Sequence, residues 1–190
     1  MKATQMVFVI ALCSLTPVFP RIAHAQNADV AAMAGALPRV WHGTWAGNLT
    51  VHSQDGASFE RGMELAIEPD QDAKNLTWRM VSEFRGRTTV RNYELVAVSG
   101  EPGHYEIDEK NGIVLDAWLM GTVLYTYYKD GDVLITARYE LRKEGLSMEL
   151  ATVDLAKPRV STLKEEEETF EVHSFRLLDA QTGILVKQSK

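Results

Sequence analysis

From Trp41 to the end of the chain, apolar and polar residues alternate with a period of two, and this alternation constrains the fold more than any other feature. Successive side chains of a β-strand point to opposite faces, so such a run predicts a strand with one buried face. Met63, Leu65 and Ile67, for example, alternate with Glu64 and Glu68. The pattern therefore predicts an all-β domain.

Turn signals separate the alternating runs at short intervals. Asp55-Gly56, Asn111-Gly112 and Asp130-Gly131 are pairs that tight turns between antiparallel strands prefer. Most connections are too short for the long crossings of a β-sandwich, and closure of the sheet would remove its exposed edges. We expect an antiparallel up-and-down barrel of about 8–10 strands, with a β-sandwich as the alternative.

The last part of the chain contains its most polar segment, Lys164 to Glu168. We expect a strand that ends before Lys157-Pro158, and then a solvated loop over this segment, because neighbouring glutamates repel one another. A last strand is expected from Phe170 to Leu178. A turn from Asp179 to Gly183 would then precede the apolar tail Ile184-Leu185-Val186.

The first 25 residues carry the parts of a secretory signal peptide in order. Lys2 precedes an apolar stretch from Met6 to Phe19, and Ala23-His24-Ala25 forms a small-residue exit. A membrane anchor needs roughly 20 apolar residues, whereas Pro17 and Arg21 shorten this stretch. We expect cleavage after Ala25 and a protein that is periplasmic or secreted.

The expected mature chain divides into residues 26–40, a tail or short helix, and residues 41–190, a single domain. Cleavage would remove Cys13, the only cysteine, so a disulfide is not expected. It would also leave 18 basic and 26 acidic residues, a net charge of −8. This balance argues against a nucleic-acid partner, and no integral membrane segment is expected after processing. The sequence leaves the oligomeric state open.

The first strand opens with Gly43-Thr44-Trp45, which resembles the Gly-x-Trp signature of the lipocalin-like, or calycin-type, barrels. In that family the tryptophan closes the barrel floor near a basic residue late in the chain. Arg176 is the candidate for that structural role beside Trp45. The family's disulfides are absent here. The resemblance implies a barrel that holds a small, largely apolar molecule in its mouth.

Four residues are candidates for lining such a ligand site. Arg61 shares a strand face with Phe59, Met63 and Leu65, and an inward arginine must be paired or must meet a ligand anion, because an unpaired buried charge is costly. The alternative is that Arg61 reaches water at the barrel rim. The other candidates are rings that would line either a pocket or a plain core: Trp78, Trp118 and Tyr139.

No catalytic motif is present, so no catalytic residue, metal site or cofactor is expected. The histidines left after cleavage have no close pair at ligand spacing; they are His42, His52, His104 and His173. The leading hypothesis is an exported lipocalin-like protein that binds a small, largely apolar ligand in its cavity. The alternatives are an envelope protein-interaction module with a filled core, and a hydrolase or isomerase that uses the cavity.

Overall fold

The computed structural model describes residues 37–71, 74–165 and 168–189. This part of the chain contains the 3-10 helix η1 (Arg39–Trp41) and ten strands. The first five strands are β1 (Gly43–Ser53), β2 (Ser58–Pro69), β3 (Leu76–Phe84), β4 (Arg87–Ala97) and β5 (His104–Asp108). The other five are β6 (Val114–Met120), β7 (Val123–Asp130), β8 (Val133–Leu141), β9 (Leu146–Glu165) and β10 (Glu168–Lys187).

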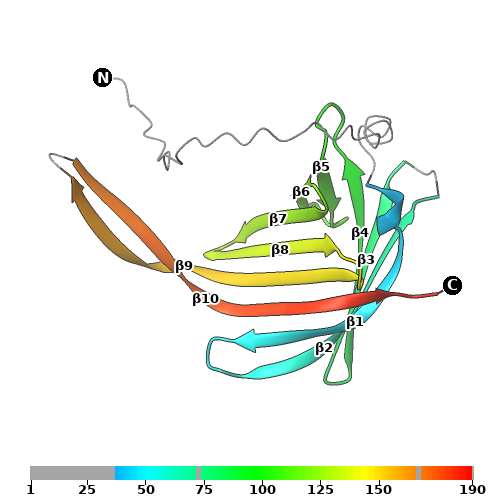
Figure 1. The fold of residues 1–190 in the computed structure, drawn as a ribbon, viewed down its shortest axis with the longest axis horizontal. Helices are drawn as coiled ribbons and strands as arrows, with labels where there is room; N and C mark the ends of the chain where they lie inside the picture. The colour runs from blue at the N-terminus through cyan, green and yellow to red at the C-terminus, as the bar shows by residue number, and fades with distance from the viewer. Residues whose placement is uncertain (1–36, 72–73, 166–167, 190) are drawn as a thin grey trace, which may run out of the picture. The chain divides into compact units, whose positions relative to one another are not determined.

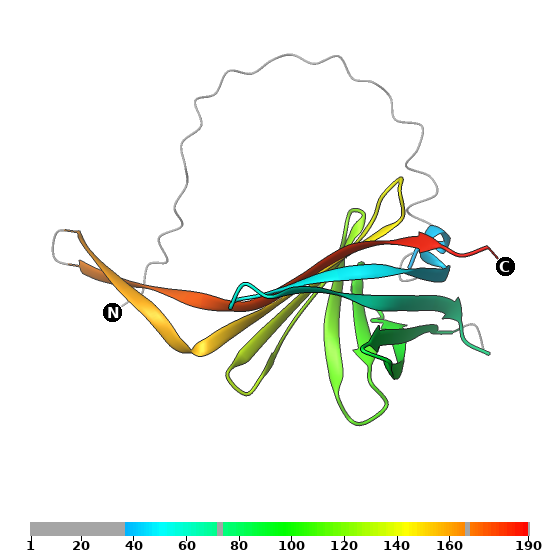
Figure 2. The same ribbon diagram turned by 90° about the horizontal axis from the view of Figure 1, so that it is seen from below.

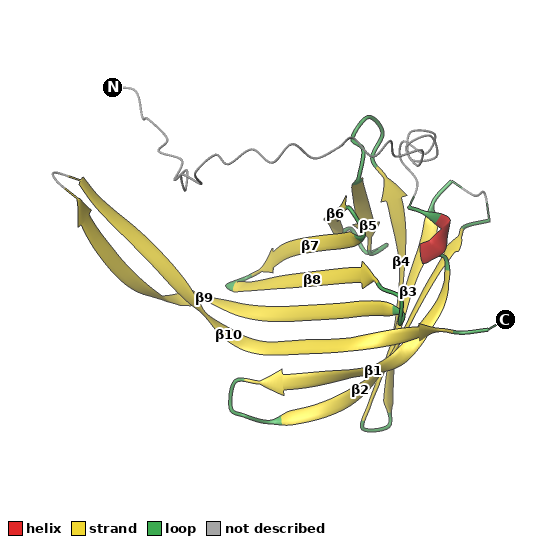
Figure 3. Ribbon diagram, in the orientation of Figure 1, coloured by secondary structure: helices red, strands yellow, loops and turns green. Residues whose placement is uncertain are grey.

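The ten strands form one closed antiparallel barrel in which each strand pairs with its neighbours in sequence (Figures 1 and 3). Closure comes from β1 and β10, whose pairing runs from Trp45 opposite Lys187 to Ser53 opposite Asp179. Every connection joins neighbouring strands, as in an up-and-down barrel. The prediction of an all-β barrel of about 8–10 strands is confirmed.

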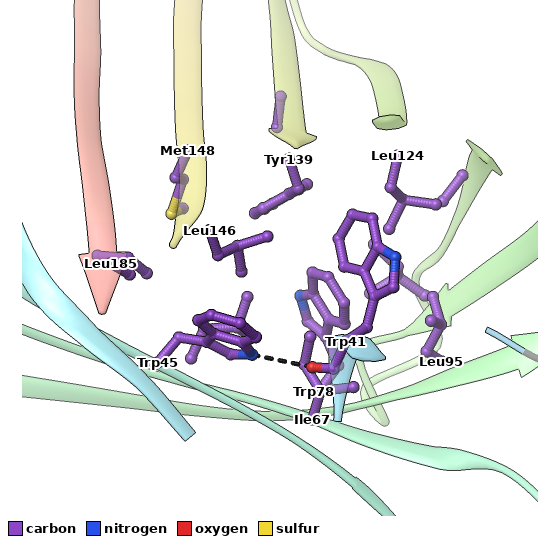
Figure 4. Close-up of a cluster of buried hydrophobic side chains, with 14 of the residues drawn as sticks. Trp41, Trp45, Ile67, Trp78, Leu95, Leu124, Tyr139, Leu146, Met148 and Leu185 are labelled. Carbon is purple, nitrogen blue, oxygen red and sulfur yellow. Dashed lines mark hydrogen bonds between the residues drawn. The ribbon is translucent and has the colours of Figure 1, made fainter. Parts of the chain in front are cut away.

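Hydrophobic side chains fill one end of the barrel (Figure 4). Helix η1 supplies Trp41, whose carbonyl oxygen accepts a hydrogen bond from Trp45 Nε1 at 2.9 Å. Trp78 and Tyr139 meet edge to face, with ring centroids 5.1 Å apart. The remaining fully buried members include Leu37, Leu49, Leu65, Ile67, Leu124, Leu146, Met148 and Leu185. We call this set the filled end; it is the hydrophobic core of the domain.

The wall of the other half is incomplete on one side. β4 pairs with β5 only over residues 94–97, and β6 pairs with β7 only as far as Thr126. Within the described residues, β4 residues 87–93 and β7 residues 127–130 therefore have no hydrogen-bonded neighbour on their facing sides. This half of the barrel, which we call the open half, is bounded there by side chains rather than by strands.

The expected turn from Asp179 to Gly183 is wrong, because these residues lie inside β10. Gly183 is needed for a close approach of strands rather than for a turn. A Cβ atom there would collide with the carbonyl oxygen of Asn48 on β1, and one at Gly47 would lie 2.8 Å from the carbonyl oxygen of Ile184. The two glycines allow β1 and β10 to come together where the barrel closes.

β9 and β10 continue beyond the barrel as a two-stranded arm, residues 156–165 and 168–175 (Figures 1 and 2). The expected strand end before Lys157-Pro158 is wrong, since β9 runs on to Glu165. Pro158 falls at an irregularity where β9 residues 155–158 have no registered partner. Proline is tolerated at such bulges because no ladder hydrogen bond is lost. Glu165 and Glu168 are paired with each other, so both ends of the expected loop lie in strands.

The expected signal peptide and most of the expected segment 26–40 lie outside the described residues. Of that segment, Arg39 and Val40 belong to η1. No helix in the described part of the chain has the length and hydrophobicity to cross a membrane.

Trp78→Ala should lower the free energy of unfolding by about 3–5 kcal/mol, the usual cost of removing a core tryptophan. The matched control is Trp118→Ala, because Trp118 is 39% exposed on the outer face of β6. Its loss should cost about 1 kcal/mol or less. Urea unfolding of both variants measures the difference, and equal losses would contradict a core confined to the filled end.

Candidate functional site

The open half of the barrel contains a cavity of about 280 Å³. Its lining comes from alternate positions of seven strands, as the two-residue period requires. The polar lining residues are Arg61, Ser82, Thr89, Arg91, Tyr128, Thr152 and Gln181, and the apolar ones are Met63, Met80, Ile135 and Leu150. Met63, Met80 and Leu150 also belong to or pack against the hydrophobic core, so the cavity has an apolar floor.

Arg61 is the most unusual residue of the lining. Its terminal nitrogens donate long hydrogen bonds to Gln181 Oε1 at 3.3 Å and Ser82 Oγ at 3.4 Å. Charge-assisted bonds between a guanidinium and a carboxylate are about 2.7–2.9 Å long. Its Nε atom is buried and has no hydrogen-bond partner in the described part of the chain. Arg61 is thus held by neutral groups and retains an unused donor.

A second guanidinium, that of Arg91, lies among tyrosines in the same half of the barrel. Burial raises the pKa values of Tyr93, Tyr128 and Tyr139, and the positive charge of Arg91 opposes the rise at all three. The described residues show no carboxylate within ion-pair distance of either Arg61 or Arg91. The cavity is thus lined by the part-buried Arg61 and the exposed Arg91, and neither has a paired anion in the described part of the chain.

Two carboxylates contact the neighbours of these arginines. Asp179 accepts a hydrogen bond from Gln181 Nε2 at 3.2 Å, and Glu109 accepts one from Tyr93. Neither carboxylate is among the residues that line the cavity. They orient the polar lining and leave the guanidinium donors available.

The outer face of β2, β3 and β4 has a larger hollow of about 590 Å³. Unlike the arginines of the interior cavity, its basic residues are paired with carboxylates. Arg79 pairs with Glu64 at 2.8 Å, and Lys110 pairs with Glu94 at 2.6 Å. Its basic groups are thus satisfied by the protein itself. The interior cavity is the better candidate for a ligand site because its cations are not.

The four ligand candidates from the sequence occupy three different places. Arg61 lines the cavity. Trp78 and Tyr139 lie in the filled end, where they pack against each other. Trp118 lies on the outer surface and stacks on His104, with ring centroids 4.0 Å apart. Only Arg61 of this set contributes to the cavity.

The structural pair expected around Trp45 has a different cation. Lys187 Nζ lies 5.0 Å from the centroid of the Trp45 ring, the place expected for Arg176. Arg176 instead stands opposite Asp154 near the base of the arm. The register of β10 explains the difference, since Trp45 pairs with Lys187 at the far end of that strand.

Sequence reasoning missed Arg91 and Gln181. Arg91 has the same parity as Tyr93 and Leu95, so the two-residue period carried the signal for an inward arginine. Gln181 was hidden by the turn expected over residues 179–183.

His104 forms a separate titratable cluster on the outer surface. Its Nδ1 atom is 2.8 Å from Glu101 Oε2 and its Nε2 atom is 2.7 Å from Asp116 Oδ1. Carboxylates only accept hydrogen bonds, so both ring nitrogens donate and the geometry suits the imidazolium form. The hydrogen bond to Asp116, with that to Glu101, raises the pKa of His104. The described residues contain no group of acids and histidines suited to hold a metal ion.

The raised pKa predicts a pH-dependent contribution of His104 to stability. The contribution is complete below the unfolded-state pKa, about 6.5, and is lost as pH rises through the higher folded-state value. His104→Gln should therefore destabilise the protein more at about pH 5.5 than at about pH 9. Urea unfolding at both pH values measures this, with His52→Gln as the exposed control. An equal loss at both pH values would contradict the imidazolium arrangement.

The sequence matches no family model and no curated protein. Among solved structures, it is similar to the S-type phycobiliprotein lyase CPES from Guillardia theta, with a TM-score of 0.51 and 10% sequence identity. The match covers 79% of this chain and 89% of the lyase chain. At this identity the likeness concerns the fold alone. The chain thus shares the overall fold of that lyase over the matched part.

Proposed function

We propose that the protein is an exported binding protein that holds a small amphipathic anion in the open half of its barrel. The anionic group would accept hydrogen bonds from Arg61, including its unused Nε donor, and would lie in the field of Arg91. The apolar part would contact Met63, Met80 and Ile135. This extends the expectation of a largely apolar ligand by adding a negative charge that Arg61 can bind.

The observation that carries the proposal is the unbalanced charge of Arg61. Arg61 is part-buried, and neutral groups hold its guanidinium, so the charge loses part of its hydration without gaining a counter-ion, which is costly. A barrel selected only for stability would place an aliphatic residue there, as it does at Met63 and Leu65 on the same face. An arriving carboxylate or similar anion would supply the missing partner.

The size of the cavity limits the ligand. Its volume of 280 Å³ lies at the lower end for small-molecule pockets. A compact ligand fits entirely, and a longer one would extend through the incomplete wall between β4 and β7. The likeness to a lipocalin-like lyase fold is consistent with small-ligand binding. A filled-core interaction module accounts for only one half of the interior.

A matched pair of probes tests the charge requirement. Octanoate and 1-octanol share a chain length and differ in charge, so calorimetric titration of both isolates the head group. Octanoate should bind more tightly, and Arg61→Met should weaken it by about 10–100-fold, the equivalent of one charge-assisted hydrogen bond. Octanol affinity should stay unchanged.

Arg79→Met is the control variant, because Arg79 lies on the outer face and is paired with Glu64. It should leave octanoate binding as in the unmodified protein. Equal affinity for octanoate and octanol, no octanoate binding up to millimolar concentration, or an Arg61→Met variant with full octanoate affinity would contradict the proposal.

Export is the part of the proposal that rests on the N-terminal sequence pattern alone. Intact mass measurement of the protein isolated from its native source should give a chain that begins at Gln26. A chain that retains residues 1–25 would overturn it.

A further inference from the structure

The arm formed by β9 and β10 exposes an unusual amount of apolar surface. Its strands pair only with each other, and one face groups Leu163, Phe170 and Val172. These side chains are 50%, 39% and 60% exposed, respectively. An isolated two-stranded ribbon is marginally stable in water. The exposed apolar face of the arm therefore suits an interface.

The charges of the arm are divided between its base and its tip. Residues 156–161 and 172–175, at the base, carry Lys157 and Arg159 and no acid, and Arg176, the next residue of β10, stands opposite Asp154 in the barrel. The described residues toward the tip, 162–165 and 168–171, carry three glutamates and a single lysine. The arm is therefore positive where it leaves the barrel and negative where it ends.

We infer that the arm docks against the arm of a second copy of this chain in an antiparallel pair. In that arrangement the basic base of each arm faces the acidic tip of the other. Val172 of each copy lies near the centre of the pair, and Leu163 and Phe170 lie between the centre and the tip. A parallel pair would set base against base and tip against tip, which like charges disfavour. The same surface serves both partners, as a two-fold interface requires.

The length of the arm sets the strength of this pairing. Eight to ten residues per strand span roughly 26–33 Å, and two strands are about 10 Å wide, so one face offers roughly 250–350 Å² per partner. The total lies below the roughly 1,000 Å² of a stable interface. The pair is therefore a weak, concentration-dependent dimer. It leaves the barrel cavity of each copy as described.

Sedimentation velocity of the purified full chain, from micromolar to about 1 mM, tests the inference. The protein should pass from monomer to dimer over this range, and the dimer should weaken at high salt because of the charges. Phe170→Ser should abolish the dimer. Val186→Ser is the matched control, because Val186 is 56% exposed on the same strand within the barrel.

Charge reversal identifies the orientation. Arg159→Glu and Glu168→Arg should each weaken the dimer by roughly tenfold. The two changes combined in one chain should restore it, since base and tip then exchange signs together. Melting temperatures close to that of the unmodified protein would show that the barrel is intact in these variants.

A protein that stays monomeric at all concentrations would overturn the inference, as would a dimer that persists in Phe170→Ser. Failure of the double charge reversal to recover the dimer would overturn the antiparallel orientation. A monomer that co-sediments with phosphatidylcholine vesicles would assign the arm to a membrane surface instead. None of these outcomes depends on octanoate binding, so the two proposals fail separately.

Discussion

The pairing of β1 with β10 is the constraint on which the rest of the structure depends. It converts a ten-strand meander into a closed barrel. In the closed barrel, alternate side chains of each strand point to the interior and to the outer surface. Gly47 and Gly183 permit this contact, since a side chain at either position would meet the backbone of the opposite strand. The same closure brings Lys187 over the Trp45 ring and Gln181 within reach of Arg61. One seam therefore contributes both to the core and to the candidate site.

The interior divides into two halves with different roles. In the filled end, Trp41, Trp45 and Trp78 each remove about 150–250 Å² from water, roughly 4–6 kcal/mol per side chain as an upper figure. The stability gained by burying these tryptophans allows the open half to keep polar groups that do not stabilise the fold. Arg61, with its buried and unpartnered Nε atom, is the clearest such group. The chain thus concentrates its stability in one half and leaves the other available for a ligand.

Much of the fold follows from local sequence, and the exceptions have physical causes. The alternation around Leu65 and the turn pairs such as Asn111-Gly112 were sufficient to predict an antiparallel barrel, and parity alone indicated that Arg61 points inward. Glycine reads as a turn signal in a sequence, so the long β10 was divided at Gly183, where tertiary contact with β1 is the real requirement. Pro158 suggested the end of a strand because its place at a bulge depends on the register of a partner. Trp118 is a residue type that often lines pockets. The pairing of β6 with its neighbouring strands nevertheless places it on the outer face.

In the proposed function, the guanidinium of Arg61 donates hydrogen bonds to the anionic group of the ligand. Nuclear magnetic resonance of the arginine Nε–H groups tests it most directly, with the Arg61 signal assigned from its absence in Arg61→Met. Addition of octanoate should shift the Arg61 Nε–H signal downfield and slow its exchange with water, because the buried donor gains a charged acceptor. An Arg61 signal that does not move while octanoate binds elsewhere on the protein would contradict the account.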